Sequence, residues 1–433
     1  MRRIFPDYTY GPGPRDGCWW DETIDSPNWP VQYGECAVDV AIVGGGFTGA
    51  SAALHLAENA ASVAVCEAET PGWGASGRNG GFCCLGGSKL AHATMCRRYG
   101  AAHARAFQKA EQDAVQLVAD LLSRYQIEAD THSQGETQLA HSKRAFDALR
   151  RKADDADVLH TSDDLPGLGI AGPFFGGCSI PTGFGLNPRK YLFGLTSQAE
   201  SLGVQFFQKS PVREIRKAVD GFTLETPTGR IRAKSVLVCT NGYSSEDVPD
   251  WMAGRYMPAQ STVLVTDVMS QQDLLAQGWS SDQVCYDTRN LLHYFRLMPD
   301  GRFLFGMRGG LRSSARTEAA IRKKVLADFR QMFPAWSGIG VSHIWSGMVC
   351  LSRSLMPFVG PIPGQAGAFA AFAYHGNGVA MGTYCGRALA HMVLGAESGV
   401  PELMTRRPER FPLGRWRRAV MPPAYAAMAV ADL

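Results

Sequence analysis

The feature that most constrains this chain is a strand, a glycine-rich turn and a helix in direct succession near its start. Residues 38–45, VDVAIVGG, are a continuous apolar run rich in β-branched residues, which is typical of a buried parallel strand. Residues 49–59, GASAALHLAEN, combine helical spacing with strong helix formers, and residues 62–68, SVAVCEA, have the pattern of a second strand. Together they predict a βαβ unit, and therefore a parallel sheet covered by helices.

Three glycines occupy the turn between the first strand and the helix in a GxGxxG pattern: Gly44, Gly46 and Gly49. The first allows the tight turn, the second lets a pyrophosphate approach the backbone, and the third lets the helix pack closely on the strand. Glu67 ends the second strand, where a carboxylate can bind ribose hydroxyls. In this context the pattern predicts a dinucleotide site, with the anion at the N-terminus of the helix.

A second glycine-rich stretch follows where the βαβ alternation ends. Residues 72–81, GWGASGRNGG, contain five glycines and one charge, Arg78, so they cannot form a stable helix or strand by themselves. Two later segments, KSVLVCTNGYS (234–244) and YHGNGVAMG (374–382), also place glycine turns after buried strands. This arrangement favours FAD over NAD, because a further helix N-terminus can stabilise the anionic edge of a reduced flavin.

The composition argues against two other classes of protein. The net charge of +3 gives no concentrated basic face for nucleic acid. No apolar run reaches the ~18 residues that span a bilayer, and the first residues, MRRIFPDYTY, lack the apolar core of a signal peptide. The 11 cysteines form no CxxC pair, so we expect reduced thiols in a cytoplasmic protein. The basic run at 406–418 is expected to be a solvated tail.

The glycine-rich segments, taken with WSG…MPFVG (345–360), resemble the glycine/D-amino-acid oxidase superfamily of FAD proteins. Within it, they are most similar to the gamma-glutamylputrescine oxidoreductase branch, over about residues 36–395. The resemblance implies a mixed α/β fold, in which a Rossmann-like FAD-binding domain carries an inserted antiparallel-sheet substrate domain.

From the pattern and the resemblance together we expect four parts. The FAD-binding domain would comprise residues 38–90, 176–250 and 341–400, and the substrate-binding domain residues 91–175 and 251–340. Residues 1–37 would form an extended N-terminal arm without its own core, and residues 401–433 a C-terminal tail. Helical spacing predicts helices over residues 100–125, 142–155, 190–202 and 316–333.

The resemblance also implies which residues would hold FAD, which we expect to be bound without a covalent tether. Gly44, Gly46 and Gly49 would hold the pyrophosphate, Glu67 the adenosine ribose, and Val212 the adenine through its backbone. The other implied contacts come from the glycine-rich segments and their flanks: Phe47, Thr48, Ala68, Gly74, Ala75, Ser76, Arg78, Asn79, Gly80, Gly81, Thr240, Asn241, Gly242, Gly376, Asn377, Gly378, Val379 and Ala380.

Members of this family oxidise a carbon–nitrogen bond. Hydride passes from the carbon beside an amine to flavin N5, water hydrolyses the imine, and O2 or another acceptor reoxidises the flavin. The implied substrate is a small secondary or terminal amine that bears a carboxylate: sarcosine-, iminodiacetate- or glutamylputrescine-like. Two alternatives stay open: an FAD-dependent dehydrogenase that passes electrons to a quinone or carrier protein, and an FAD-binding component of an RNA-modifying or multi-subunit assembly.

A predicted hairpin at 291–310, LLHYFRLMPDGRFLFGMRGG, supplies substrate-side candidates. With a tight turn at its DG dipeptide, His293 would face Arg308 and share its side, while Tyr294 and Arg296 would lie on the other. We expect the His293 and Arg308 side to meet the flavin, with Arg308 as a fork for a substrate carboxylate. The Tyr294 and Arg296 side is the alternative, because a bulge would reverse the alternation.

His375, beside the third glycine turn, is the last catalytic candidate, and it could orient substrate or flavin or simply cap the turn. Structural roles stay open for His293 and Arg308 as well. Leu304 stands where relatives that reduce O2 often have a lysine, so the electron acceptor is open. Gly347 stands where some relatives attach the flavin to a cysteine, which favours non-covalent FAD.

Overall fold

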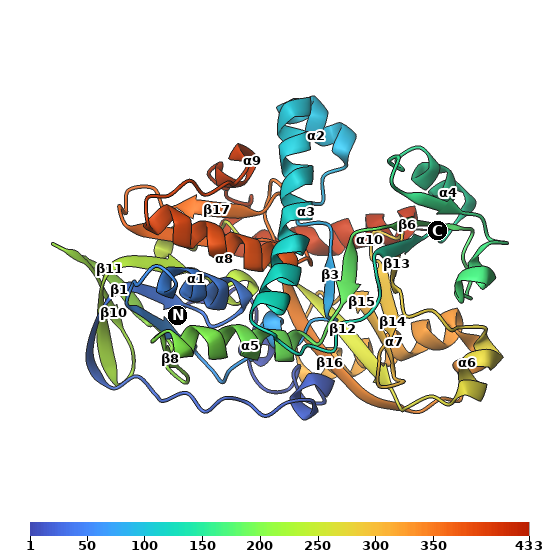
Figure 1. Cartoon of the computed structure of the whole chain (residues 1–433), viewed down its shortest axis with the longest axis horizontal. Helices are drawn as coiled ribbons and strands as arrows, with labels where there is room; N and C mark the ends of the chain where they lie inside the picture. The colour runs from blue at the N-terminus through green and yellow to red at the C-terminus, as the bar shows by residue number, and fades with distance from the viewer. Residues whose placement is uncertain (433) are drawn as a thin grey trace.

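The computed structural model describes residues 1–432 and divides them between two large sheets (Figure 1). The first sheet contains β1 (Gly34–Val43), β2 (Val63–Cys66), β8 (Gln205–Phe207), β9 (Glu214–Ala218), β10 (Gly221–Glu225), β11 (Gly229–Val238), β17 (Phe358–Pro361) and β18 (Ala368–Phe372). Its order is β17-β18-β11-β1-β2-β8, and β10 and β9 extend it from β11.

The centre of this sheet is parallel. β1 pairs in parallel with β2 and β11, and β11 pairs in parallel with β18. The carboxyl ends of these four strands therefore lie at one edge, which is where open α/β sheets bind their ligands. The helix α1 (Phe47–Ala57) connects β1 to β2, so the predicted βαβ unit is confirmed.

Helices α1, α3 (Ala101–Arg124), α5 (Pro188–Ser201) and α8 (Ala380–Val393) pack together on the first sheet. Small residues let the backbones of α1 and α8 approach each other closely. A Cβ at Gly386 of α8 would lie only 2.4 Å from the Thr48 carbonyl oxygen of α1. The Ser51 hydroxyl of α1 donates to the Thr383 carbonyl of α8 at 2.7 Å. This close contact fixes the N-termini of α1 and α8, which face the carboxyl ends of the strands.

The second sheet contains β4 (Glu136–Leu139), β5 (Val158–His160), β6 (Gly177–Ile180), β12 (Met257–Thr266), β13 (Val284–Asp287), β14 (His293–Leu297), β15 (Phe303–Arg308) and β16 (Val341–Leu351). Its order is β16-β12-β15-β14-β13-β4-β6-β5, and it is antiparallel except that β4 and β13 pair in parallel. β6 and β16 join this sheet, so the expected boundaries at 176 and 341 do not separate the two sheets. Alternating burial predicts a strand but does not say which sheet the strand joins.

One face of the second sheet is covered by α7 (Ala315–Met332), over an aromatic core that includes Phe295, Phe303, Phe305 and Phe329. The predicted helices at 100–125, 190–202 and 316–333 correspond to α3, α5 and α7, and the one at 142–155 ends earlier, as α4 (Lys143–Arg150). The smaller elements are α2 (His92–Tyr99), α6 (Gln271–Gln277), α9 (Glu402–Thr405), α10 (Met421–Ala431) and the pair β3 (Phe82–Cys84) and β7 (Gly183–Gly185). Among residues 1–432, no helix is both long and apolar enough to cross a membrane.

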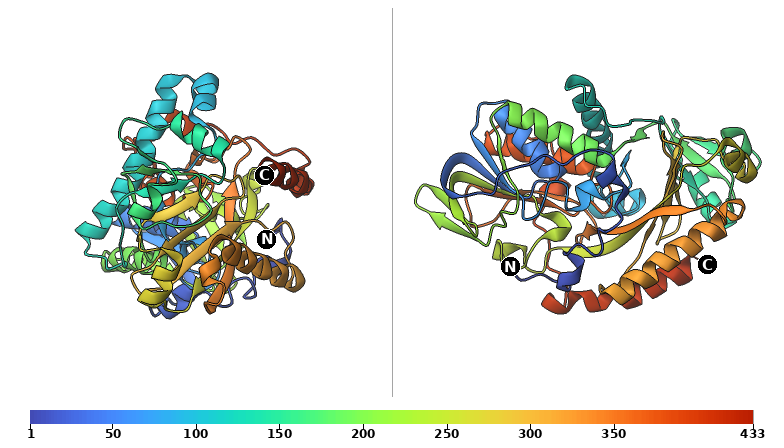
Figure 2. Two further views of the ribbon diagram at one scale, coloured as in Figure 1. Left: turned by 90° about the vertical axis from the view of Figure 1, so that its right-hand side faces the viewer. Right: turned by 90° about the horizontal axis from the view of Figure 1, so that it is seen from below.

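The two chain ends are tied to the body of the protein. The N-terminal arm has no sheet of its own before Gly34, but its Trp20 and Trp29 are buried in the cores of the two sheets. The C-terminal helix α10 runs to the second sheet (Figure 2). There Asp432 accepts hydrogen bonds from Asn290.

The expectation of a solvated tail at 406–418 is wrong for its last residues. Arg417 is fully buried, and its guanidinium pairs with Glu246 at 2.6 and 3.0 Å. Arg418 donates to the Pro258 carbonyl at 2.8 Å. A run of basic residues in a sequence does not reveal that one of them has a distant carboxylate partner.

Candidate active site

A cavity of about 470 Å³ lies at the carboxyl ends of β1, β2, β11 and β18, and the second sheet forms its other wall. Most of the residues expected to hold FAD line it: Gly44, Gly46, Phe47, Thr48, Glu67, Ala68, Gly74, Ala75, Ser76, Arg78, Asn79, Gly80, Val212, Thr240, Asn241, Gly376, Asn377 and Gly378. Five of the expected residues are not part of the cavity lining: Gly49, Gly81, Gly242, Val379 and Ala380. The four glycine-rich segments (44–49, 72–81, 234–244 and 374–382) therefore meet at one cavity.

The geometry of the GxGxxG turn requires its glycines. Gly44 has φ +106, and a Cβ there would lie 2.8 Å from the Cys239 carbonyl oxygen. A Cβ at Gly49 would lie 2.0 Å from the Gly44 oxygen, so only glycine lets the helix pack this closely on the turn. A Cβ at Gly46 would lie 2.8 Å from the Ser76 hydroxyl oxygen, which accepts a hydrogen bond from the Phe47 N–H. The second glycine stretch thus docks on the N-terminus of α1.

Glu67 closes the adenosine end of this turn. Its carboxylate accepts hydrogen bonds from the Gly45 N–H at 3.0 Å and from the Glu69 N–H at 3.1 Å, and burial raises its pKa. These two contacts hold the carboxylate at the end of β2. The position suits a ribose hydroxyl, as the spacing in the sequence predicts.

Arg78 provides a direct test of whether the cavity fits an anionic cofactor. The side chain is 2% exposed, and burial lowers its pKa. Its Nε donates to the Trp73 carbonyl at 2.6 Å and Nη1 to the Ser346 carbonyl at 3.2 Å, but Nη2 is buried without a hydrogen-bond partner. No carboxylate of residues 1–432 pairs with it. A buried cation with an unused donor in a cavity wall fits a phosphate or an anionic ring.

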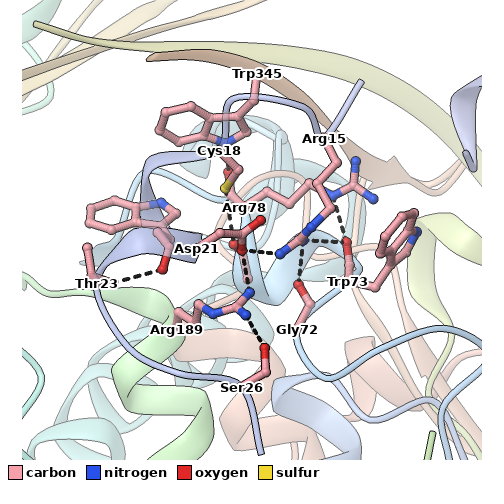
Figure 3. Close-up of polar contacts among 12 residues, drawn as sticks. Arg15, Cys18, Asp21, Thr23, Ser26, Gly72, Trp73, Arg78, Arg189 and Trp345 are labelled. Carbon is pink, nitrogen blue, oxygen red and sulfur yellow. Dashed lines mark hydrogen bonds and ion pairs between the residues drawn. The ribbon is translucent and has the colours of Figure 1, made fainter. Parts of the chain in front are cut away.

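The N-terminal arm holds this loop in place (Figure 3). Arg15 donates to the Gly72 carbonyl at 2.9 Å and to the Trp73 carbonyl at 3.2 Å. Asp21 pairs with both Arg15 and Arg189, so one carboxylate links the arm to α5. The loop that carries Arg78 is therefore positioned by contacts outside the cavity.

His375 has both ring nitrogens engaged by the backbone. Its Nε2 accepts from the Ser352 N–H at 3.2 Å, so Nδ1 carries the proton and donates to the Gly87 carbonyl at 2.8 Å. The ring is fully buried, and burial lowers its pKa to about 3. The imidazole is therefore neutral. The backbone carbonyl oxygen of His375 accepts a hydrogen bond from Arg308 at 3.0 Å.

The predicted register of the hairpin is wrong. His293 pairs with Met307, and Tyr294 pairs with Gly306, so paired residues are displaced by one from the expectation. The turn explains the difference: Met298 N–H donates to the Arg302 carbonyl, and Gly301 has φ +79, which is a three-residue loop with a left-handed glycine. Tyr294 and Arg308 consequently share the cavity side, and His293 lies on the opposite side.

His293 instead joins a buried ion-pair cluster beneath α7. Its Nδ1 donates to Asp287 at 2.9 Å and its Nε2 to Asp328 at 3.3 Å, and the ring stacks on Phe305. Burial lowers its pKa, but the two carboxylates raise it more, so the net pKa is raised. This geometry favours the doubly protonated ring and holds it away from the cavity.

Comparison with known proteins identifies the family. Residues 39–392 match the family described as DAO, FAD dependent oxidoreductase. The chain belongs to the DAO family. It is therefore an FAD-dependent oxidoreductase with the mixed α/β fold that the sequence predicts.

Several relatives of this DAO protein are similar over most of their length. It is 29% identical over 96% of its length to a probable oxidoreductase OrdL of Rhizobium meliloti, of which it covers 97%. It is 29% identical over 82% of its length to the gamma-glutamylputrescine oxidoreductase of Escherichia coli, of which it covers 84%. The structure of glycine oxidase from Geobacillus kaustophilus superposes with TM-score 0.71 at 20% identity, over 86% of this chain and 99% of that one.

Four charged side chains that line the cavity of this DAO protein were not anticipated from the sequence: Arg3, Glu69, Lys89 and Glu136. Lys89 follows the GG pair after β3, and its side chain is exposed where it lines the cavity. Glu136 begins β4 and is buried. No local pattern marks Lys89 or Glu136, because each reaches the cavity only through the pairing of distant strands.

Proposed function

We propose that this protein oxidises a carbon–nitrogen bond of a small amine or amino acid that bears a carboxylate. Arg308 carries the proposal. Its guanidinium lines the cavity beside the 374–378 turn, donates one hydrogen bond to the His375 carbonyl, and has no carboxylate partner within residues 1–432. A half-buried guanidinium fork that no carboxylate of residues 1–432 pairs with suits a substrate carboxylate. The names of the relatives, glutamylputrescine, glycine and iminodiacetate oxidoreductases, support this substrate class.

FAD, when bound, supplies the acceptor for the hydride that leaves the carbon beside the substrate nitrogen. The protein's own residues orient the substrate and exclude water from it. Arg308 holds the carboxylate, Tyr294 forms the adjacent wall through a hydroxyl that contacts Ser261 at 3.0 Å, and Lys89 adds positive charge. This positive charge favours the neutral form of an amine that lies nearby, which is the form that gives up hydride.

His375 acts in this proposal as a positioning residue, because both of its ring nitrogens are occupied and only its carbonyl reaches Arg308. We assign no catalytic role to His293. FAD is held without a covalent bond: Gly347 lines the cavity, and burial raises the pKa of the nearby Cys350 thiol to about 12. Acid precipitation of the protein should therefore release all the FAD into the supernatant.

The proposed electron acceptor is O2. Leu304, at the position where relatives that reduce O2 often have a lysine, is fully buried and does not line the cavity. Lys89, from another segment of the chain, places a lysine in the cavity lining instead. Production of stoichiometric hydrogen peroxide when substrate is added in air would support the oxidase. Substrate oxidation without peroxide, dependent on an added quinone, would support the dehydrogenase.

The experiment that tests the proposal is anaerobic addition of a panel of amines and amino acids to the purified FAD protein. Loss of the visible absorbance of oxidised flavin with carboxylate-bearing amines is expected. If no member of the panel reduces the flavin, the proposal fails.

A further inference from the structure

The wall formed by β4 and β13 holds a buried carboxylate, Glu136, one of whose oxygens is left unpaired by residues 1–432. Glu136 is 1% exposed and lines the cavity. Its Oε1 accepts a hydrogen bond from the Tyr286 hydroxyl at 3.3 Å, whereas its Oε2 is buried with no hydrogen-bond partner in the described part of the chain. An unused buried acceptor costs free energy unless a donor reaches it, and here the cavity is the route for a donor.

The charges around Glu136 are acidic. No cation of residues 1–432 forms an ion pair with it. Burial raises the pKa of Glu136 to about 7, although contacts with the Cys84 thiol and the Tyr286 hydroxyl act to lower it. Burial and, to a smaller extent, the charge of Glu136 raise the pKa of Glu111 on α3. Arg296, from β14 on the far side of β13, donates instead to the Leu186 carbonyl at 2.7 Å. Buried carboxylates in proteins are normally paired, so this group of acids calls for a cation from outside the chain.

The opposite end of the cavity carries the positive charges. Arg308 lies on β15, which is separated from β4 by β14 and β13. Since neighbouring strands are about 4.8 Å apart, three spacings place the two ends roughly 14 Å apart across the sheet. Tyr286 and Tyr294 are paired residues of β13 and β14, and both line the cavity between the two ends. The cavity therefore has an acidic end and a basic end.

We propose that Glu136, with Tyr286 and Gln138, forms a second substrate subsite that binds a cationic amino or guanidino group. The substrate is then an amine with a carboxylate at one end and a cation at the other, joined by an extended chain. A neighbouring carboxylate favours the charged form of an amine, whereas hydride leaves from a neutral amine. The group held by Glu136 is consequently not the nitrogen that is oxidised. This inference rests on the proposed function of the Arg308 end.

Binding to the holoenzyme tests the subsite without any turnover. The probes are 6-guanidinohexanoate and hexanoate, which share a carboxylate and differ in the distant cation. Calorimetry should show that the wild-type protein prefers the guanidino compound about 10- to 100-fold, as a charge-assisted hydrogen bond would give. Glu136→Gln should abolish the preference, and Glu214→Gln, an exposed charge on β9, should keep it. No preference in the wild type, or a preference that survives Glu136→Gln, overturns the proposal.

Turnover separates a binding role from a proton-transfer role. Glu136→Gln should raise KM about 10- to 100-fold for N-(4-aminobutyl)glycine and leave kcat and KM for N-butylglycine unchanged. An equal loss of kcat for both amines would contradict the subsite. If neither amine reduces the flavin, the proposed oxidation fails, but the calorimetry still decides the subsite.

A second variant guards against misfolding of the first. Tyr286→Phe removes only the hydroxyl that donates to Glu136, and it should weaken binding of 6-guanidinohexanoate about threefold, as loss of one ordinary hydrogen bond would. Binding of hexanoate should not change. Bound FAD absorbance and circular dichroism establish that each variant is folded, and unchanged binding of both probes by Tyr286→Phe would count against the subsite.

Discussion

Arg78 is the residue on which FAD binding is expected to depend most. It is the one charge of the 72–81 loop, it is buried, and its Nη2 has no partner in the described chain. Replacing Arg78 by Lys keeps the charge but loses the fork, so the Kd for FAD should rise about 10- to 100-fold. Fluorescence titration of the apoprotein measures this. Arg216→Lys, on the exposed strand β9, is the control, and an unchanged Kd for Arg78→Lys would show that Nη2 does not bind the cofactor.

Arg308 should determine the affinity for carboxylate-bearing substrates. Arg308→Lys should lower kcat/KM about 10- to 100-fold for amines with a carboxylate, because a single ammonium cannot replace a two-pronged contact. The same amines without the carboxylate should be unaffected. A uniform loss for both kinds of amine would instead indicate damage to the 374–378 turn, whose His375 carbonyl Arg308 contacts.

Most of the site residues that could be predicted from the sequence belong to the glycine-rich segments, whose composition is unusual. Gly44 and Gly46 are marked because no other residue fits a tight turn or a close approach to Ser76, and Arg78 is marked by being the only charge among glycines. Lys89 and Glu136 carry no such mark. Their side chains become functional candidates only because β3 and β4 lie beside the same cavity.

At the scale of the element, the β14–β15 hairpin shows how one residue in a turn changes the interpretation of a whole strand. Helix and strand positions follow from hydrophobic spacing, and the turn itself was found in the right place. The left-handed Gly301 adds a third loop residue, which moves His293 to the far side and Tyr294 to the cavity side. Sequence alone does not distinguish a two-residue from a three-residue loop at an Asp-Gly pair.

The cluster around His293 predicts a pH-dependent stability. The carboxylates of Asp287 and Asp328 raise the net pKa of His293, so its stabilising charge is fully present below the ordinary value of about 6.5 and is lost as the pH rises through the raised pKa. The Tm of the wild type should therefore exceed that of His293→Gln at acidic pH, and the difference should shrink at alkaline pH.

Thermal unfolding from mildly acidic to alkaline pH measures this difference. His92→Gln, an exposed histidine, should show the wild-type profile throughout. A difference that stays constant across the range would mean that His293 stabilises the protein by packing on Phe305 and not by its charge.

At the scale of the whole molecule, the chain ends join the two sheets. Arg417, from the basic run near the C-terminus, is buried against Glu246 and the Tyr256 carbonyl. Arg417→Ala should lower the free energy of unfolding by about 3 kcal/mol, because it leaves a shielded carboxylate without its partner. Arg415→Ala, two residues away and exposed, should change it by less than about 0.5 kcal/mol. Equal effects of the two substitutions in denaturant unfolding would contradict the assignment.

The overall architecture was predictable to the extent that it follows from local patterns. The βαβ unit was predicted from the 38–68 segment, and the mixed α/β fold from the family resemblance that the glycine stretches carry. The membership of β6 and β16 in the second sheet and the burial of Arg417 were not, since both depend on contacts between residues far apart in the chain.

The central claim is that FAD in this cavity accepts hydride from an amine held by its carboxylate at Arg308. The most direct measurement is anaerobic mixing of the purified protein with N-butylglycine and, separately, with N-methylbutylamine, which keeps the secondary amine but lacks the carboxylate. The account predicts that N-butylglycine bleaches the flavin at concentrations about 10- to 100-fold lower than N-methylbutylamine needs. Flavin that stays oxidised with both amines, or that is bleached equally by both, would contradict it.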